Sequence, residues 1–180
     1  SFQKTGLSID DSKHFAKIAL HNAVKIAHDS IKGDVNILGS IAPLEDCYKP
    51  ELFPGYDIAK DEFSEITLWL NESNIDIFLI ETMNNIKESI ACIECAQEFD
   101  KPIWISFVLK DDKHILSGEK LIDALTMLKN HSIDVVLLNC NPINRTKDAI
   151  DILISNWDKK WGIYPNLGIG EPSPDGIISN

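Results

Sequence analysis

Short apolar runs alternate with longer amphipathic stretches along this chain. The runs occupy residues 35–38, 75–80, 103–108, 134–140 and 161–164. Runs that are apolar on consecutive positions predict strands buried on both faces, as in parallel sheets covered by helices. After a longer first interval the runs begin about 30 residues apart, which is typical of repeated βα units.

The stretches between the runs carry apolar residues at helical spacing. We expect helices over about residues 9–31, 59–72, 85–99, 118–130 and 146–157. Ser8 is a residue type that commonly caps the start of a helix, and Gly33 is one that commonly ends it, so we expect them to bound the first helix. Residues 41–56 predict a loop long enough to carry binding groups, and residues 168–180 predict a Gly- and Pro-rich loop.

The alternation of strands and helices predicts an α/β fold of the (β/α)8 TIM-barrel type. Right-handed crossovers make such a sheet parallel and bring all carboxyl ends of the strands to one side. A full barrel has eight strands and takes about 250 residues, whereas the 180 residues here supply five runs. We therefore expect residues 1–180 to form a single domain, an incomplete barrel of about five βα units that lacks the first and last strands.

Composition narrows the classes of partner. Hydrophobic residues make up 44% and charged residues 25%, and the formal net charge is -11 at pH 7. This acidic balance argues against nucleic acid or an anionic membrane as the main partner. No apolar run approaches the roughly 20 residues of a membrane span. Four cysteines do not make a disulfide framework in a chain of this length, so we expect a reducing, cytoplasmic setting.

Polar side chains stand at or just after the predicted strand ends, where α/β enzymes place their chemistry. They are Ser40, Glu81, Ser106, Asn139, Cys140 and Asn166. A carboxylate such as Glu81 at the end of a buried strand costs free energy unless it meets a cation, a donor or water. Cys140 is a candidate metal ligand or nucleophile, and equally a small core residue.

The remaining cysteines and the histidines predict structural roles. Cys92 and Cys95 form a C-x-x-C inside a predicted helix, without the turn and second ligand pair of a zinc site, and so predict core thiols. We interpret Cys47 as an incidental thiol in the predicted loop. Three histidines recur every seventh residue on the first helix, about 10 Å apart, too far to share one metal ion. We interpret them, His14, His21 and His28, as a solvated stripe.

Six short motifs, in order along the chain, resemble one family. They are Gly39-Ser-Ile-Ala-Pro-Leu-Glu-Asp-Cys-Tyr, Asp76-Ile-Phe-Leu-Ile-Glu-Thr-Met, Pro102-Ile-Trp-Ile-Ser-Phe, Leu116-Ser-Gly-Glu, Leu138-Asn-Cys and Tyr164-Pro-Asn-Leu-Gly. Each motif is weak alone, but the ordered set covers nearly the whole chain. Together they resemble the homocysteine S-methyltransferase family, zinc-dependent (β/α)8 barrels.

The resemblance implies an enzyme that transfers a methyl group from a small donor to the zinc-bound thiol of homocysteine, giving methionine. The donors of this type are S-methylmethionine, S-adenosylmethionine and betaine. By the resemblance, Cys140 matches a zinc ligand and Glu81 matches the acid that holds the substrate ammonium group. We expect the other polar residues of the strand ends to contact substrate as well, namely Ser40, Ser106, Asn139 and Asn166.

The chain also departs from the family pattern. The family's other two zinc cysteines belong to a Gly-Gly-Cys-Cys motif that does not occur here. We therefore expect an incomplete zinc site and an internal, inactive portion of such an enzyme. The alternative is a non-catalytic fragment or degenerate barrel that binds a small amino acid or a protein partner. A barrel enzyme for anionic substrates is disfavoured, because no Gly-rich phosphate loop is present.

The expected absence of some barrel strands also predicts self-association of the isolated chain. An open five-stranded sheet exposes two apolar edges and part of the barrel lining, which favours association. We therefore expect the isolated chain to pair with another copy or to rearrange.

Overall fold

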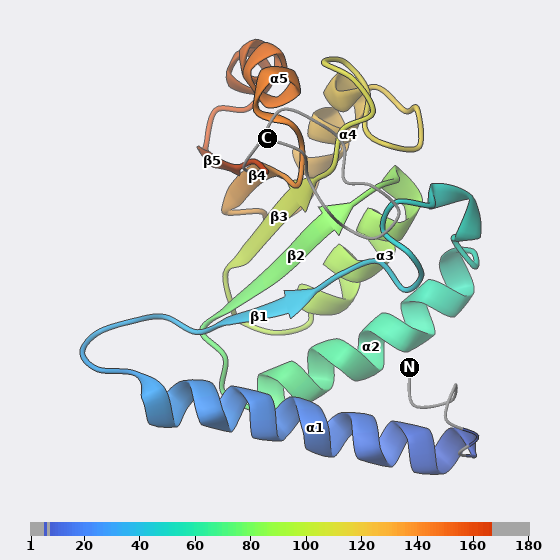
Figure 1. Ribbon diagram of the computed structural model, residues 1–180, viewed down its shortest axis with the longest axis vertical. Coiled ribbons are helices and arrows are strands. Elements are labelled where there is room, and N and C mark those ends of the chain that lie inside the picture. Colours follow the sequence, from blue (N-terminus) through green and yellow to red (C-terminus); the bar gives the residue numbers. More distant parts are fainter. Residues whose placement is uncertain (1–5, 7, 167–180) are drawn as a thin grey trace.

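Five parallel strands form one sheet in which each strand pairs with the next along the chain. The structure is a computed structural model that describes residue 6 and residues 8–166, so the loop expected at residues 168–180 lies outside the described residues. Figure 1 shows the strands side by side with their arrowheads at the same edge. They are β1 (Leu38–Ile41), β2 (Ile77–Met83), β3 (Ile103–Phe107), β4 (Val135–Asn139) and β5 (Lys160–Tyr164).

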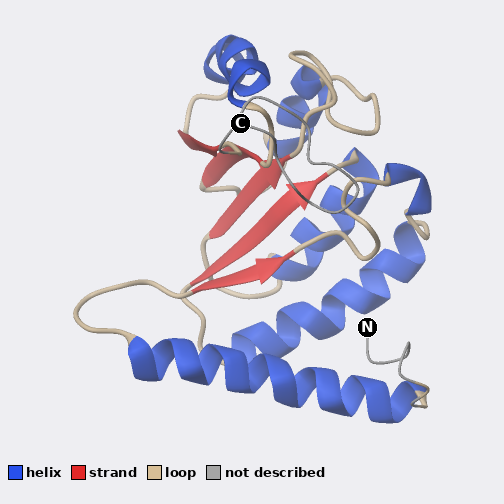
Figure 2. Cartoon of the chain, in the orientation of Figure 1, coloured by secondary structure: helices blue, strands red, loops and turns tan. Residues whose placement is uncertain are grey.

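Helices alternate with the strands, as the βα cadence predicts, with one α-helix before the first strand and one between each successive pair of strands. They are α1 (Ile9–Ser30), α2 (Tyr56–Glu72), α3 (Ile86–Ala96), α4 (Leu121–Leu128) and α5 (Ile143–Asn156), with a short 3-10 helix at Pro50–Leu52. Figure 2 shows helices along one side of the sheet, whereas no described helix covers its opposite face. The α/β fold with a parallel five-stranded sheet is therefore confirmed, and its order is that of consecutive strands of a barrel.

Burial along the strands separates an outer, helix-facing side from an inner side. Phe78 and Ile105 on the outer side are fully buried, whereas Leu79 and Trp104 on the inner side are half-buried. The register pairs Leu79 with Trp104, so these two residues share a face. The packed core thus lies between the sheet and the helices, and the inner side of the sheet is open in the described part of the chain.

The outer side also buries the C-x-x-C pair. Cys92 and Cys95 lie on α3 and both are fully buried. Burial raises the pKa of the Cys92 thiol well above its ordinary value, so that thiol stays protonated and behaves as a small apolar group. The prediction of core thiols is confirmed.

The first strand lies three residues later than the apolar run at residues 35–38 predicts. Val35 is exposed, and pairing begins at Leu38. The backbone N–H of Ile37 donates to the Asp76 carboxylate at 2.6 Å, and the N–H of Asp76 donates back to the carbonyl of Ile37 at 2.8 Å. This exchange aligns the start of β1 with β2, so Gly39 and Ser40 lie inside the strand rather than after it.

Gly39 is confined by the helix layer. A Cβ at this position would lie 2.5 Å from Cδ1 of Ile75 and 3.0 Å from Cδ2 of Leu70. We expect Gly39→Ala to lower the free energy of unfolding by about 1–3 kcal/mol through overpacking, measured by urea denaturation. Gly162→Ala is the matched control, because its Cβ would meet only the half-buried Leu137, at 2.9 Å, and should cost less. Equal losses would contradict this account of the packing.

Strand β5 is an edge strand in the described part of the chain. Trp161 is 42% and Ile163 38% exposed, so apolar surface accompanies unpaired backbone groups. We expect static light scattering of the isolated chain to give a mass above that of one copy. Trp161→Lys should reduce this association, because a charge on an edge strand opposes pairing. A monodisperse wild-type monomer would be the opposite outcome.

Candidate functional site

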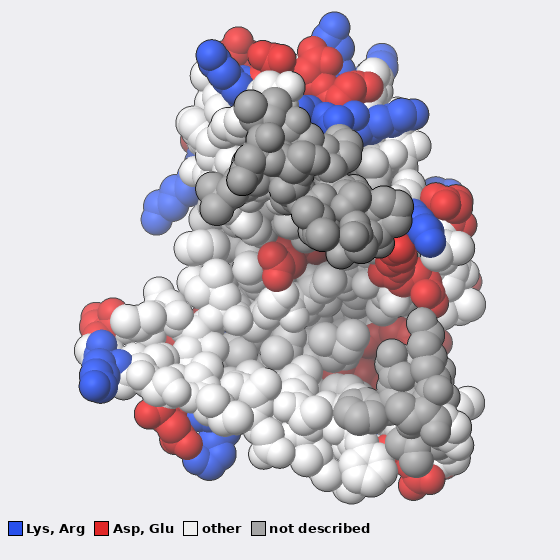
Figure 3. Space-filling view, viewed as in Figure 1, with Lys and Arg blue, Asp and Glu red and all other residues white. Residues whose placement is uncertain are grey.

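Polar side chains gather on the inner side of the sheet at its carboxyl edge. The register places Ser40 beside Leu79, which fixes the strand positions that point inward. Positions of the same alternation carry polar groups near every strand end. We call this set the inner rim; it consists of Ser40, Glu81, Ser106, Asn139 and Tyr164. Figure 3 shows mostly uncharged surface here, with acidic atoms in the hollow and Lys and Arg around the margin.

Glu81 is the acid of the inner rim, and both of its oxygens accept hydrogen bonds. The hydroxyl of Ser40, from β1, donates to Oε1. The hydroxyl of Tyr164, from β5, donates to Oε2 at 3.1 Å. A half-buried carboxylate needs such donors to offset the loss of water. Three strands thus meet at one side chain.

Ser106 links the Tyr164 hydroxyl to the backbone of β2. Its Oγ accepts the backbone N–H of Thr82 at 3.0 Å and lies 2.9 Å from the Tyr164 oxygen. Because the Tyr164 proton is donated to Glu81, the Ser106 hydroxyl must donate to Tyr164. Burial, with the charge of Glu81 adding to it, raises the pKa of the Tyr164 phenol well above its ordinary value, so the phenol remains a donor at neutral pH.

Cys140 follows β4 directly and lies at the same edge. Asn139 Nδ2 donates to Thr82 Oγ1 at 2.7 Å and lies 3.2 Å from the Cys140 sulfur. Asn166 Nδ2 donates to the Cys140 carbonyl at 3.1 Å. These contacts fix the turn that carries the thiol, which is half-buried and not in a disulfide.

Two residues at this edge adopt left-handed backbone conformations. Thr82 has a φ of 59° and Cys140 a φ of 53°. Such angles are uncommon for residues other than glycine, and for a β-branched residue such as Thr82 they are an outlier. Backbone strain of this kind clusters at functional sites. It coincides here with a register shift between Ile80 and Met83, beside Glu81.

A metal site is not complete among the described residues. No group of three or more His, Cys, Asp or Glu side chains in residues 8–166 could hold a metal ion. Catalytic zinc sites normally use three protein ligands, and Cys140 supplies one thiol. The residues present therefore do not fit a whole zinc site.

The other thiol near this edge, and the histidines, do not supply the missing ligands. Burial, then the charges of Asp46 and Cys140, raise the pKa of the half-buried Cys47 thiol, and this thiol belongs to no group of three or more ligands among residues 8–166. His14 and His28 are exposed along α1, and His21 is half-buried with Nε2 3.7 Å from Glu72. The histidine stripe is thus mostly solvated, as predicted.

A buried carboxylate anchors the loop that follows β1. Glu88, on α3, accepts the backbone N–H of Leu44 at 2.8 Å and Asn85 Nδ2 at 3.0 Å. Next to it, Asn84 Nδ2 donates to the carbonyl of Cys47 at 3.0 Å. Burial raises the pKa of Glu88 above its ordinary value. The loop is therefore tied to the region where α3 begins by two side chains, those of Asn84 and Glu88.

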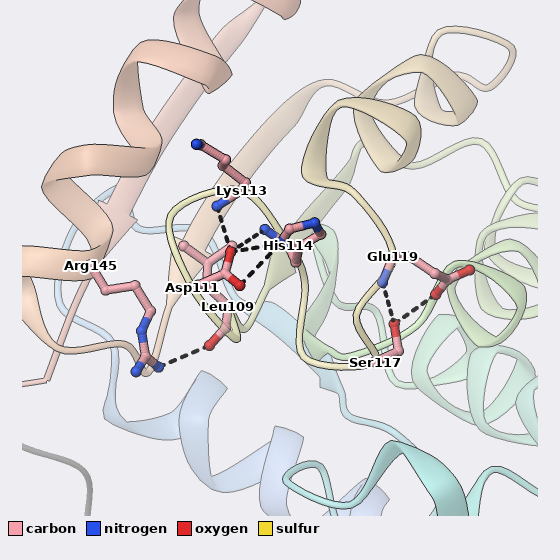
Figure 4. Close-up of polar contacts among 7 residues, drawn as sticks. All are labelled: Leu109, Asp111, Lys113, His114, Ser117, Glu119 and Arg145. Atoms are coloured by element: carbon pink, nitrogen blue, oxygen red, sulfur yellow. Dashed lines mark hydrogen bonds and ion pairs between the residues drawn. The ribbon is translucent and has the colours of Figure 1, made fainter.

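The loop that follows β3 is closed by its own polar contacts, which Figure 4 shows. Asp111 accepts the backbone N–H groups of Lys113 and His114, each at 2.9 Å, and contacts the His114 ring. Arg145 donates to the carbonyl of Leu109 at 3.0 Å. Hydrogen bonding, first to the N–H of Lys113, lowers the pKa of Asp111. These residues stabilise the loop and contact no member of the inner rim in the interactions described.

The structure brings together the residues that the sequence singles out. Ser40, Glu81, Ser106, Asn139, Cys140 and Asn166 all lie at the carboxyl edge of the sheet. Their roles toward a substrate stay predictions. Tyr164 and Thr82 are additions, although Tyr164 opens one of the six motifs and ends a predicted strand.

Comparison with known proteins decides the family. The sequence model described as Homocysteine S-methyltransferase matches residues 1–177. The chain belongs to the homocysteine S-methyltransferase family. Among curated family members, homocysteine S-methyltransferase YbgG of Bacillus subtilis (strain 168) is 32% identical over 119 residues, which are 63% of this chain and 38% of that protein. Homocysteine S-methyltransferase 2 of Zea mays is 35% identical over 102 residues, 55% of this chain and 30% of that protein.

Solved structures of the family share the fold. The homocysteine methyltransferase MmuM from Escherichia coli, in its apo form, superposes with a TM-score of 0.79 at 21% identity. The match covers 91% of this chain and 63% of MmuM. The metallated form of MmuM gives a TM-score of 0.77 at 21% identity. This chain therefore spans less than two thirds of the solved relatives that it matches.

The Glu88 anchor can be tested without a ligand. Because Glu88→Ala leaves the N–H of Leu44 without its acceptor, we expect a loss of about 1–3 kcal/mol in the free energy of unfolding and faster proteolysis within residues 42–55. Glu94→Ala on the same helix is the control, since the partners of Glu94, Lys60 and Tyr56, lie at the surface, and its loss should cost less than about 1 kcal/mol. Proteolysis at the wild-type rate in Glu88→Ala would contradict the anchor.

Proposed function

We propose that this chain is part of an enzyme that transfers a methyl group from a small donor to the thiol of homocysteine. The observation that carries the proposal is the placement of Glu81 and Cys140 at one edge of the sheet, linked through Thr82 and Asn139, in a member of this family. The Glu81 carboxylate suits the ammonium group of an amino acid, and the Cys140 thiol suits a metal ion that holds the substrate sulfur.

Glu81 is proposed to bind the substrate ammonium group. Its carboxylate accepts one hydroxyl proton on each oxygen, and each oxygen retains a further lone pair. Hydrogen bonds in which both partners are charged are stronger than neutral ones. The inner rim holds a fixed negative charge and no Lys or Arg, which favours a cationic group. Asn139, Ser106, Ser40 and Asn166 are proposed to surround the substrate.

Cys140 is proposed to contribute one thiolate to a zinc ion. A bound zinc would keep the homocysteine sulfur as a thiolate near neutral pH. Since residues 8–166 hold no group of three or more possible ligands, a complete zinc site requires ligands beyond the described part of the chain. The residues of this chain are proposed to bind the ammonium group of the substrate.

A second candidate function is binding of a small amino acid without methyl transfer. Two observations favour it: both oxygens of Glu81 have hydrogen-bond donors, whereas residues 8–166 hold no group of three or more metal ligands. We propose a cytoplasmic setting for either function. No helix in the described residues is long and apolar enough to cross a membrane.

The two candidates differ in their response to Cys140→Ser. In the protein that contains this chain, we expect the change to abolish methyl transfer to L-homocysteine while leaving amino-acid binding largely intact. S-methylmethionine, S-adenosylmethionine and betaine would be assayed in turn as donors. Cys47→Ser is the matched control, because this loop thiol is also half-buried and should retain activity. Full activity in Cys140→Ser would exclude the proposed role of the thiol.

A further inference from the structure

The hydrogen bonds around Glu81 form a chain with a single direction. The Thr82 N–H donates to Ser106, Ser106 donates to Tyr164, and Tyr164 donates to Glu81 Oε2. The backbone N–H can only donate and the carboxylate can only accept, so the two hydroxyls between them have one consistent arrangement of protons. Hydrogen bonds in such chains polarise and strengthen one another.

Tyr164 reaches Glu81 across the curve of the sheet. Strands β3 and β4 separate β5 from β2, a distance of about 14 Å along a flat sheet. The 3.1 Å contact therefore depends on the reach of two long side chains together with the curvature of the sheet. Ser106 lies between the two strands and supports the phenol at 2.9 Å.

We propose that Tyr164 is a positioning residue, whose hydroxyl holds the Glu81 carboxylate in the orientation that receives the ammonium group of an amino-acid substrate. The inference rests on the proposed function, since it gives Glu81 that partner. Ser40 fixes the other oxygen, so the carboxylate is held from two strands. Without the Tyr164 hydroxyl, Oε2 loses its donor and the Glu81 side chain can leave this orientation.

Tyr164→Phe tests the hydroxyl alone, because the ring and its packing remain. Calorimetry would give the affinities for L-homocysteine and for 4-mercaptobutanoate, which lacks only the amino group, in reducing buffer. We expect the preference for homocysteine to fall about tenfold, the effect of one hydrogen bond to a charged group, with 4-mercaptobutanoate unaffected. A purely structural role would weaken both ligands equally and would overturn the proposal.

Two variants control the experiment. Tyr56→Phe removes another Tyr-to-Glu hydrogen bond, from Tyr56 to Glu94 on the helix layer, and should leave the preference unchanged. Glu81→Gln should lower the preference at least as much as Tyr164→Phe. If Glu81→Gln keeps the wild-type preference, the proposed function of Glu81 fails. If Glu81→Gln loses it and Tyr164→Phe does not, only the positioning role fails.

A ligand-free measurement decides the case in which neither compound binds. Three-bond couplings in NMR spectra report the side-chain rotamer of Glu81. We expect one rotamer in the wild-type chain and in Tyr56→Phe, and rotamer averaging in Tyr164→Phe. A single unchanged rotamer in Tyr164→Phe would overturn the positioning role, whereas the absence of homocysteine binding would count against the proposed function only.

Discussion

The Glu81 carboxylate, held at the end of β2 by hydroxyls from β1 and β5, is the contact on which the inner rim depends. A half-buried negative charge must be compensated, and here the compensation comes from strands at both edges of the sheet. The same hydrogen bonds therefore stabilise the charge and link β1 and β5, the two edge strands of the described sheet. Each oxygen of the carboxylate keeps a lone pair that can accept one further hydrogen bond.

Local backbone conformation and long-range packing cooperate at this edge. The left-handed residues Thr82 and Cys140 turn the chain where β2 and β4 end, and Asn139 contacts both. The helix layer packs densely behind them, with Phe78 and Ile105 fully buried. A rigid outer layer thus supports an open inner side, the arrangement in which barrel enzymes bind substrates at the carboxyl edge.

The sequence predicts what depends on neighbouring residues and misses what depends on distant ones. All five strands were predictable, because each leaves a short apolar run in the sequence, although the expected burial on both faces is not seen in the described residues, where β5 is mostly exposed. The start of β1 was not, since it depends on a hydrogen bond between Ile37 and Asp76, 39 positions apart. Four of the five inner-rim residues were predictable from strand ends, whereas Tyr164 was not, because its contact with Glu81 joins residues 83 positions apart.

We propose that Glu81 binds the ammonium group of an amino-acid substrate at the inner rim. A crystal structure of the protein with L-homocysteine bound would test it most directly. We expect the amino nitrogen to lie within hydrogen-bond distance of the Glu81 carboxylate, with the sulfur directed toward Cys140. A homocysteine amino group bound elsewhere, with Glu81 still paired only to Ser40 and Tyr164, would contradict it.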